Sequence, residues 1–339
     1  MNILLTSAGR RNYLINYFRK ALQGKGHVLA ADASADAPAL QEADKAYVVP
    51  LASDSKYMEK ILQICRENEV GLLVSLNDLE LPVIAKHRHL FLNNGTIPVI
   101  SSAEIINTCF DKWETHNFLQ SIGIYSPKTY LSLHDARKAL LSGALSFPVV
   151  VKPRWGTASI GIEYAHDLEE LELAYRVSSL RLKRSFLAKV SSSSPEYSIL
   201  IQEYIQGDEY GLDIINDLNG NYVTTVVKRK LIMRAGETDR AITIVDDHLN
   251  AVGEMVGKHL AHVGNLDCDV FVNTKGVSFL EMNPRFGGGY PFSHIAGLNL
   301  PAALISWARC EVPSPEWFAA ETNVASAKCD GIVRIRSGN

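Results

Sequence analysis

A short apolar run near the end of the chain carries an acid and an amide two residues apart. The run reads Phe279-Leu280-Glu281-Met282-Asn283. Because side chains alternate sides along a strand, Glu281 and Asn283 should share one face. If residues 274–276 connect it to the preceding run, Asp269 falls opposite Glu281. Carboxylate and amide oxygens suit Mg²⁺, with phosphate oxygens and water completing its coordination. We expect a divalent-cation site, with the exposed polar face of an ordinary hairpin as the alternative.

A lysine ends a second apolar run, Val149-Val150-Val151-Lys152. An ammonium group at the end of a buried strand is costly to desolvate without an anion partner. The following turn contains Gly156, Thr157, Ser159 and Gly161, and such a turn can direct backbone N–H groups at phosphate oxygens. It lacks the Walker pattern GxxxxGKS or GxxxxGKT. The segment predicts phosphate binding under a movable flap, and a hairpin with a surface lysine is the alternative.

A third segment combines a strand, a turn and an acid. An apolar run from residue 199 ends in Gln202-Glu203-Tyr204-Ile205, then Gly207 follows, and Glu209 comes two residues later. The backbone of such a segment can hydrogen-bond to the edge of an adenine, and a nearby carboxylate can accept hydrogen bonds from ribose hydroxyls. A solvated turn with surface acids is the alternative.

The elements that must position these motifs change character along the chain. Near the N-terminus, apolar runs read as strands at Ile3–Thr6, Val28–Ala31, Tyr47–Val49, Leu72–Ser75 and Ile97–Ile100. Helical periodicity occupies Tyr13–Leu22, Tyr57–Asn68 and Leu79–Phe91. Such alternation predicts a parallel sheet with helices on its faces. The turn Ser7-Ala8-Gly9-Arg10-Arg11 can contact an anion. Because it lacks GxGxxG, a tight βα turn is favoured over a dinucleotide site.

Residues 101–145 look mainly helical. Ser101-Ser102-Ala103-Glu104 fits a capping box, and Asp111 can cap the next helix, which should run to about Gly123. From residue 147 onward, longer strands pair through turns such as Asn219-Gly220. That pattern predicts an α+β region with antiparallel sheets.

Composition narrows the class of protein. The chain has 339 residues, 47% of them hydrophobic, and a net charge of -3, so a sizeable core is expected and a polyanionic partner is not. Five cysteines without CxxC spacing fit reduced thiols and give no support for a structural zinc site. The N-terminal apolar run is too short for a signal peptide, and no run approaches a membrane-spanning length. We expect a cytoplasmic protein with neither a nucleic-acid nor a membrane partner.

In this order and spacing, the three motifs resemble the ATP-grasp superfamily, and especially its carbamoyl-phosphate-synthase-like carboxylate–amine ligases. The resemblance covers most of the chain. It implies a pre-ATP-grasp α/β domain with a Rossmann-like parallel sheet at 1–105, followed by an α+β two-lobed grasp fold. The small lobe, with its flexible phosphate loop, would span 106–205, and the large lobe, with the metal site, would span 206–339.

The resemblance also implies a role for each matching residue. Cofactor binding would fall to Lys112, Lys152, Gly156, Thr157, Ser159, Gln202, Glu203, Tyr204, Ile205 and Glu209, with the adenine read largely by backbone groups. The metal ligands would be Asp269, Glu281 and Asn283, and the catalytic cations would be Arg285, Lys230 and Arg234. Lys228 shares a strand face with Lys230, so one of the two lysines could instead be solvated.

The same resemblance places substrate contacts at five further positions: Asp78, Glu80, Gly288, Gly289 and His294. Asp78 and Glu80 lie where similar ligases carry an acidic turn that could hold an ammonium group. A helix N-cap at Asn77 or Asp78 is an equally good interpretation. For His294, a packed helix histidine is the stronger one.

The implied function is an ATP-dependent ligase that uses Mg²⁺, or alternatively Mn²⁺, to join a small-molecule carboxylate to an amine or a thiol. The acid would be activated as an acyl phosphate, and ADP and phosphate would be released. Similar ligases are commonly dimers, which makes a homodimer a candidate state. One rival is a non-catalytic ATP-binding regulatory subunit of the same fold. The other is a nicotinamide oxidoreductase, against which the missing GxGxxG counts.

Overall fold

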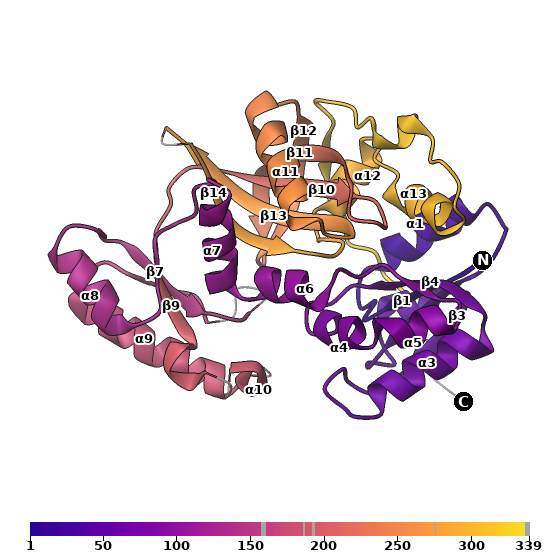
Figure 1. Cartoon of the computed structure of the whole chain (residues 1–339), viewed down its shortest axis with the longest axis horizontal. Helices are drawn as coiled ribbons and strands as arrows, with labels where there is room; N and C mark the ends of the chain where they lie inside the picture. Colours follow the sequence, from indigo (N-terminus) through magenta and orange to yellow (C-terminus); the bar gives the residue numbers. More distant parts are fainter. Residues whose placement is uncertain (157–160, 186, 192–193, 275, 336–339) are drawn as a thin grey trace.

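Five short strands near the N-terminus form the predicted parallel sheet (Figure 1). The computed structural model describes residues 1–156, 161–185, 187–191, 194–274 and 276–335. The strands are β1 (Asn2–Thr6), β2 (Val28–Asp32), β3 (Lys45–Val48), β4 (Val70–Ser75) and β5 (Ile97–Pro98), in the order β3-β2-β1-β4-β5. The central strands are almost wholly apolar because helices cover both faces of the sheet.

Helices from both ends of the chain cover this sheet. They are α1 (Asn12–Leu22), α2 (Pro38–Glu42), α3 (Tyr57–Glu67), α4 (Leu81–Lys86) and α5 (Arg88–Asn93), together with the distant α13 (Leu300–Ala308). One apolar core joins the sheet to α1 and α13, and the other joins it to α3, α4 and α5. Figure 1 shows α13 beside α1. A segment from near the C-terminus thus completes the N-terminal domain.

The single helix predicted over Leu79–Phe91 is wrong, since two helices meet at His87. The His87 ring nitrogen Nδ1 lies 2.8 Å from the Val83 carbonyl. The His87 backbone N–H donates instead to the Ile84 carbonyl, at 3.0 Å. This tighter turn ends α4, and α5 begins at the next residue.

Three helices follow the first sheet, as the sequence predicts: α6 (Ala103–Phe110), α7 (Lys112–Ser121) and α8 (Leu133–Leu141). The predicted capping box is wrong, because Ser102 is the N-cap and accepts a hydrogen bond from Ile105 N. Ser101 Oγ accepts one from the distant Val263 N, at 2.9 Å, and so ties α6 to the later sheet. Asp111 caps α7 by accepting from Trp113 N at 3.0 Å, as expected.

A small antiparallel sheet forms one end of the molecule, at the left in Figure 1. It contains β6 (Thr129–Tyr130), β7 (Val149–Pro153), β8 (Glu163–Ala165) and β9 (Ile199–Glu203), in the order β6-β9-β7-β8. Apolar residues of α8 and α9 (Leu168–Lys183) form a core with β7 and β9. Two short helices, α10 (Ala188–Ser191) and the 3₁₀ helix Pro195–Tyr197, precede β9. This lobe holds Lys152 at the end of β7.

A larger antiparallel sheet lies between that lobe and the N-terminal domain (Figure 1). Its strands are β10 (Asp208–Asn216), β11 (Tyr222–Arg234), β12 (Glu237–Ile244), β13 (Gly264–Asn273), β14 (Gly276–Asn283) and β15 (Ala325–Ala327), in the order β14-β13-β10-β11-β12-β15. Apolar residues on one face pack against α6, α7 and α11 (Asp247–Leu260). The alternate residues of β11, β13 and β14 are charged and face the site described below.

The remaining elements link the large sheet to the N-terminal domain. They are α12 (Tyr290–Ile295) and the 3₁₀ helix Pro315–Phe318, on either side of α13. Tyr290 is fully buried in the core that α1 and α13 share. Across the described ranges, we find no helix with both the length and the hydropathy needed to span a membrane.

Candidate active site

Strands β13 and β14 place four oxygen-bearing side chains on one face. Asp269 pairs with Glu281, as predicted, and Asp267 pairs with Asn283. The predicted three-residue connection is wrong, because Asn273 pairs with Gly276 and leaves two residues between them. A register shift between Asp269 and Val270 compensates for the missing residue. Without that bulge, the whole of β14 beyond it would be displaced by one residue relative to β13.

This face suits a Mg²⁺ ion that is shared with a nucleotide. The donors comprise the carboxylates of Asp269 and Glu281 and the amide of Asn283, whose Nδ2 lies 3.3 Å from Glu281 Oε1. Within the described ranges, no three His, Cys, Asp or Glu side chains converge closely enough to hold a metal by themselves. Mg²⁺ bound to nucleotides usually takes only one or two carboxylates, with phosphate and water supplying the rest. The donor set therefore fits a nucleotide-bound ion better than a resident one.

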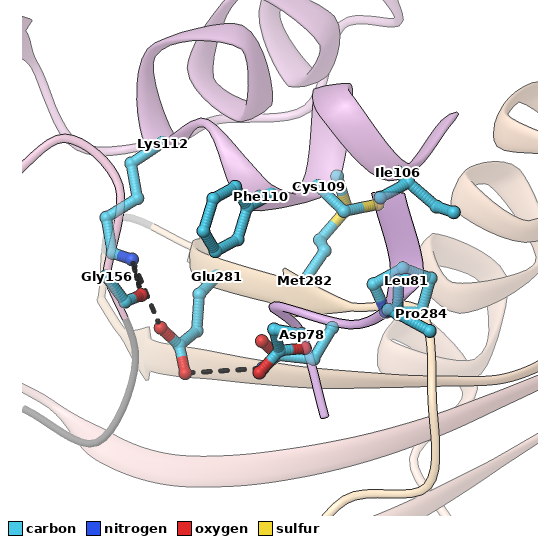
Figure 2. Close-up of a pocket in the computed structure, with 11 residues that line it drawn as sticks. Asp78, Leu81, Ile106, Cys109, Phe110, Lys112, Gly156, Glu281, Met282 and Pro284 are labelled. Atoms are coloured by element: carbon cyan, nitrogen blue, oxygen red, sulfur yellow. Dashed lines mark hydrogen bonds and ion pairs between the residues drawn. The ribbon is translucent and has the colours of Figure 1, made fainter. Parts of the chain in front are cut away.

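Two lysines, one at the start of α7 and one on β7, lie close to this acidic strand. Lys112, at the start of α7, donates to the Gly156 carbonyl at 2.7 Å and lies 3.7 Å from Glu281 Oε2. Figure 2 shows Lys112 and Glu281 pointing toward one another, with Gly156 beside them. The contact joins the start of the predicted phosphate loop to β14, the strand that carries Glu281.

Lys152 is the second lysine and is only 7% exposed. Burial, and then the like charge of Lys112, lower the pKa of its amine to about 7. Within the described part of the chain, no carboxylate lies within ion-pair distance of this amine. The buried amine of Lys152 therefore has no counter-ion at ion-pair distance among the described residues. A phosphate group would supply one.

The end of β9 and the residues just after it lie next to β7, the strand that carries Lys152. Gln202 is buried and donates from Nε2 to Thr129 Oγ1 at 2.8 Å, while Glu203 accepts from Tyr125 Oη at 2.5 Å. Tyr204 is exposed and makes an edge contact with Tyr164, and Ile205 is buried. These side chains are engaged with their own lobe. Recognition of a base by this segment would therefore rest on backbone groups.

Lys230 connects Glu209, the predicted ribose-binding acid, to Asp269, one of the predicted metal ligands. Its amine lies 2.6 Å from Glu209 Oε1 and 2.6 Å from Asp269 Oδ1. Burial alone would lower the pKa of this amine, but the two carboxylates outweigh burial and raise it. Lys230 therefore stays charged and holds the two acids together.

Arg285 connects the large sheet to the N-terminal domain. One guanidinium nitrogen, Nη2, lies 2.8 Å from Asp78 Oδ2, and Nη1 lies 3.5 Å from Asp267 Oδ2. Burial would raise the pKa of Asp78, but Arg285 outweighs it and holds the pKa below its usual value. The N-cap interpretation of Asn77 or Asp78 is wrong, since Glu80 precedes α4 without a side-chain cap. Asp78 instead orients Arg285.

A cavity of about 210 Å³ opens beside these residues. Its lining residues include Arg11, Lys228, Lys230, Glu237, Asp267, Asp269, Glu281, Asn283, Arg285, Gly288 and Gly289. Lys228 is not solvated: its side chain is 2% exposed and forms an ion pair with fully buried Asp213. One polar cavity is thus lined by the predicted metal ligands Asp269, Glu281 and Asn283, by Arg285, and by Gly288 and Gly289.

Sequence comparison agrees with this geometry. Residues 145–291 match the model of the ATP-grasp domain, and residues 3–100 match that of the PylC-like N-terminal domain. The chain therefore contains an ATP-grasp domain.

Two carbamoyl phosphate synthase large chains are similar to this chain and much longer. The chain is 23% identical over 262 residues to the carbamoyl phosphate synthase large chain of Myxococcus xanthus, a match that covers 74% of this chain but 22% of that protein. The equivalent protein of Synechocystis is also 23% identical, over 265 residues and 23% of its length. The chain therefore spans less than a quarter of these relatives.

Solved structures share the whole ATP-grasp fold. Biotin carboxylase of Campylobacter jejuni has a TM-score of 0.74 at 17% identity, over 96% of this chain and 74% of that one. The L-amino acid ligase of Bacillus licheniformis has a TM-score of 0.65 at 20% identity, over 91% and 73%. At these identities, the similarity establishes the fold.

Some predicted site residues lie apart from the ATP-grasp cavity. Arg234 forms ion pairs with Asp330, at 2.8 Å, and with Asp239, at 3.0 Å, on the outside of the β11–β12 hairpin. His294 stacks on Tyr17 with ring centroids 3.6 Å apart, which matches the packed-histidine interpretation. Burial lowers the pKa of His294 to about 4.

Glu80 is likewise committed inside the N-terminal domain. Its carboxylate accepts hydrogen bonds from four hydroxyl groups, those of Thr6, Ser7, Tyr57 and Ser75. A carboxylate with four hydroxyl donors has little remaining capacity for a substrate ammonium. Thr157 and Ser159 lie outside the described residues, so their predicted phosphate contacts remain predictions.

Sequence reasoning overlooked Asp267, Asp213 and the pocket role of Arg11. Extending the period-two pattern back from Asp269 would have found Asp267. Arg11 lay in a turn already marked as a candidate anion contact, but nothing local linked it to Arg285. Asp213 has no local signal, because its partner Lys228 stands on the neighbouring strand.

Proposed function

We propose that this protein is an ATP- and Mg²⁺-dependent ligase that joins a carboxylate to an amine through an acyl phosphate. One observation carries the proposal: Asp269 and Glu281 line one cavity with Arg285, and the same Glu281 lies 3.7 Å from Lys112. Phosphoryl transfer needs positioning and charge neutralisation more than it needs a protein nucleophile.

Each lobe would contribute one part of the reaction. Lys112 and Lys152 would bind the phosphates of ATP, and Arg285 would orient the acid and balance charge at the γ-phosphate. A carboxylate oxygen attacks the γ-phosphorus, and the bond to the bridging oxygen breaks to release ADP. The amine nitrogen then attacks the acyl carbon, phosphate leaves, and the nitrogen loses its proton.

The metal ligands in this scheme would be Asp269, Glu281 and Asn283. Bound Mg²⁺ would neutralise the phosphate oxygens as negative charge shifts during transfer. Without a nucleotide, Lys230 neutralises the charge of Asp269, and Lys112 neutralises that of Glu281. The ATP-grasp match and the names of the relatives, which include a carbamoyl phosphate synthase and an L-amino acid ligase, support the same class of reaction.

The test is a screen for ADP and phosphate release over pairs of acids and amines, with mass spectrometry of each productive pair. We expect product formation that depends on both substrates and on Mg²⁺. The variant Glu281→Gln should lose at least about 100-fold in kcat/KM, because a metal ligand is removed. Glu254→Gln, at a partly exposed acid on α11, is the matched control. ATP binding with no turnover across the panel would instead favour the regulatory-subunit alternative.

A further inference from the structure

Arg11 stands at the point where the strand order of the N-terminal sheet reverses. It follows β1, and its Nη1 donates to the carbonyl of Leu76, which follows β4. Strands β2 and β4 flank β1 on opposite sides. Open α/β sheets bind ligands in the crevice at such a reversal, outside the carboxyl ends of the strands. This crevice opens into the cavity, since Arg11 lines it together with Arg285.

Among the described residues, the guanidinium of Arg11 makes no ion pair with an acid. Every other cation that lines the cavity has one: Lys228 pairs with Asp213, Lys230 with Glu209 and Asp269, and Arg285 with Asp78 and Asp267. Among the described residues, none brings a carboxylate within ion-pair distance of Arg11. Burial and the like charge of Arg285 outweigh the attraction of Asp78 and Glu237 and lower the pKa of Arg11.

The cavity wall also contains residues without a bulky side chain. Gly288 and Gly289 line it together with Arg11. Glu237 forms its ion pair with Lys328, at 2.8 Å, and acts on Arg11 only from beyond ion-pair distance. Arg285 adds a second unsatisfied donor, because its Nε is buried without a hydrogen-bond partner among the described residues. Two arginines with spare donors therefore border the same space.

We propose that Arg11 binds a second carboxylate, carried by one of the two substrates and separate from the carboxylate that reacts. The inference rests on the ligase function proposed above and narrows its substrates to acids or amines with an additional carboxylate. The planar guanidinium can hold a carboxylate through two parallel N–H donors. Nη1 already donates to the carbonyl of Leu76, so Nε and Nη2 are the pair of donors proposed to hold the carboxylate.

The first experiment compares substrates that differ by one carboxylate. Butyrate and succinate form the acid pair, and ethylamine and alanine form the amine pair, each tested against the full set of partners. Product formation should require the extra carboxylate either on the acid or on the amine. The pair of compounds in which it is required identifies the substrate that carries it. In those reactions Arg11→Met should lower kcat/KM at least about 10-fold. Arg10→Met, at the exposed neighbour in the same turn, should stay within about twofold.

A second experiment needs no turnover. Phenylglyoxal modifies arginines, and peptide mass spectrometry can follow Arg11 and Arg10 separately in protein saturated with Mg²⁺ and ADP. Glutarate, as a probe dicarboxylate, should slow modification of Arg11 but not of Arg10, relative to chloride at equal ionic strength. Equal modification of Arg11 with both salts would overturn the proposal, as would productive substrates that lack the extra carboxylate. A failure to form ADP with any pair would count against the ligase itself, whereas protection of Arg11 would still support the anion site.

Discussion

The guanidinium of Arg285 forms an ion pair with Asp78 across a separation of 207 residues, with Nη2 and Oδ2 2.8 Å apart. Arg285 follows the metal strand of the ATP-grasp domain, and Asp78 follows β4 of the N-terminal domain. Both side chains are almost fully buried. The pair therefore couples the parallel sheet to the residues proposed to handle the transferred phosphate.

Asp78→Asn should weaken catalysis more than folding. Arg285 would keep only Asp267 as an ionic partner, at 3.5 Å, and its guanidinium would lose its orientation. We expect kcat/KM for ADP formation to fall roughly 10- to 100-fold. Asp36→Asn, at an exposed acid of the same domain, is the control. Urea unfolding of both variants separates the two effects, and unchanged kcat/KM in Asp78→Asn would show that the pair only joins the domains.

Nucleotide binding should be coupled to protonation of Lys152. The pKa of its amine is about 7, so the free amine is mostly neutral at about pH 8. A bound phosphate would stabilise the charged form and raise that pKa. ATP affinity should therefore fall as pH rises above 7, and binding at about pH 8 should take up close to one proton more in wild type than in Lys152→Met.

Calorimetry in buffers of different ionisation enthalpy measures this uptake. Near pH 6 the free amine is already charged, so the difference between wild type and Lys152→Met should nearly vanish. Equal proton uptake by the two proteins at both pH values would mean that Lys152 does not meet the nucleotide.

Asp213→Asn should destabilise the large sheet. Asp213 is fully buried, pairs with Lys228, and accepts hydrogen bonds from Ser293 Oγ at 2.5 Å and Asn265 Nδ2 at 3.2 Å. Removing its charge leaves a buried, unpaired ammonium, which typically costs about 3–5 kcal/mol. Chemical denaturation should show this loss in the free energy of unfolding. Glu254→Gln breaks the exposed pair with Lys258 and should leave the unfolding curve unchanged.

Gly287→Ala should disturb the cavity through Asp267. A Cβ at this position would lie 2.0 Å from the carboxyl carbon of Asp267, so one of the two must move. We expect a loss of about 1–3 kcal/mol in stability and a larger relative fall in kcat/KM, because Asp267 also contacts Arg285. Gly331→Ala, where nothing lies within 4 Å of the added atom, serves as the control in both assays. Wild-type activity in Gly287→Ala would mean that Asp267 tolerates displacement.

The parts of the site that depend on local spacing could be predicted from the sequence. Glu281 and Asn283 share a face because any strand alternates its side chains, and Asp269 lies opposite because a short turn joins two strands. Lys152 ends an apolar run, and Asp111 precedes a helical one. In each case, the position of the side chain is fixed by residues of the same helix or strand, or of the next one along the chain. Even there, the compensating bulge beside Asp269 was invisible, since a two-residue turn with a bulge leads to the same pairing as a three-residue turn.

Tertiary structure alone decided which charges meet. Asp78 fitted a helix cap as well as a substrate contact, either Lys228 or Lys230 could have been solvated, and Arg11 lay in a stretch that favoured a tight βα turn, because each local sequence satisfies those roles. Their partners, or the cavity they face, come from other strands or another domain. Burial then removes water as the competing partner, and the charge across the cavity determines what each side chain does. Local sequence therefore determined the strand pair that carries the proposed metal ligands. Only folding brought the N-terminal domain against that pair and formed the cavity between them.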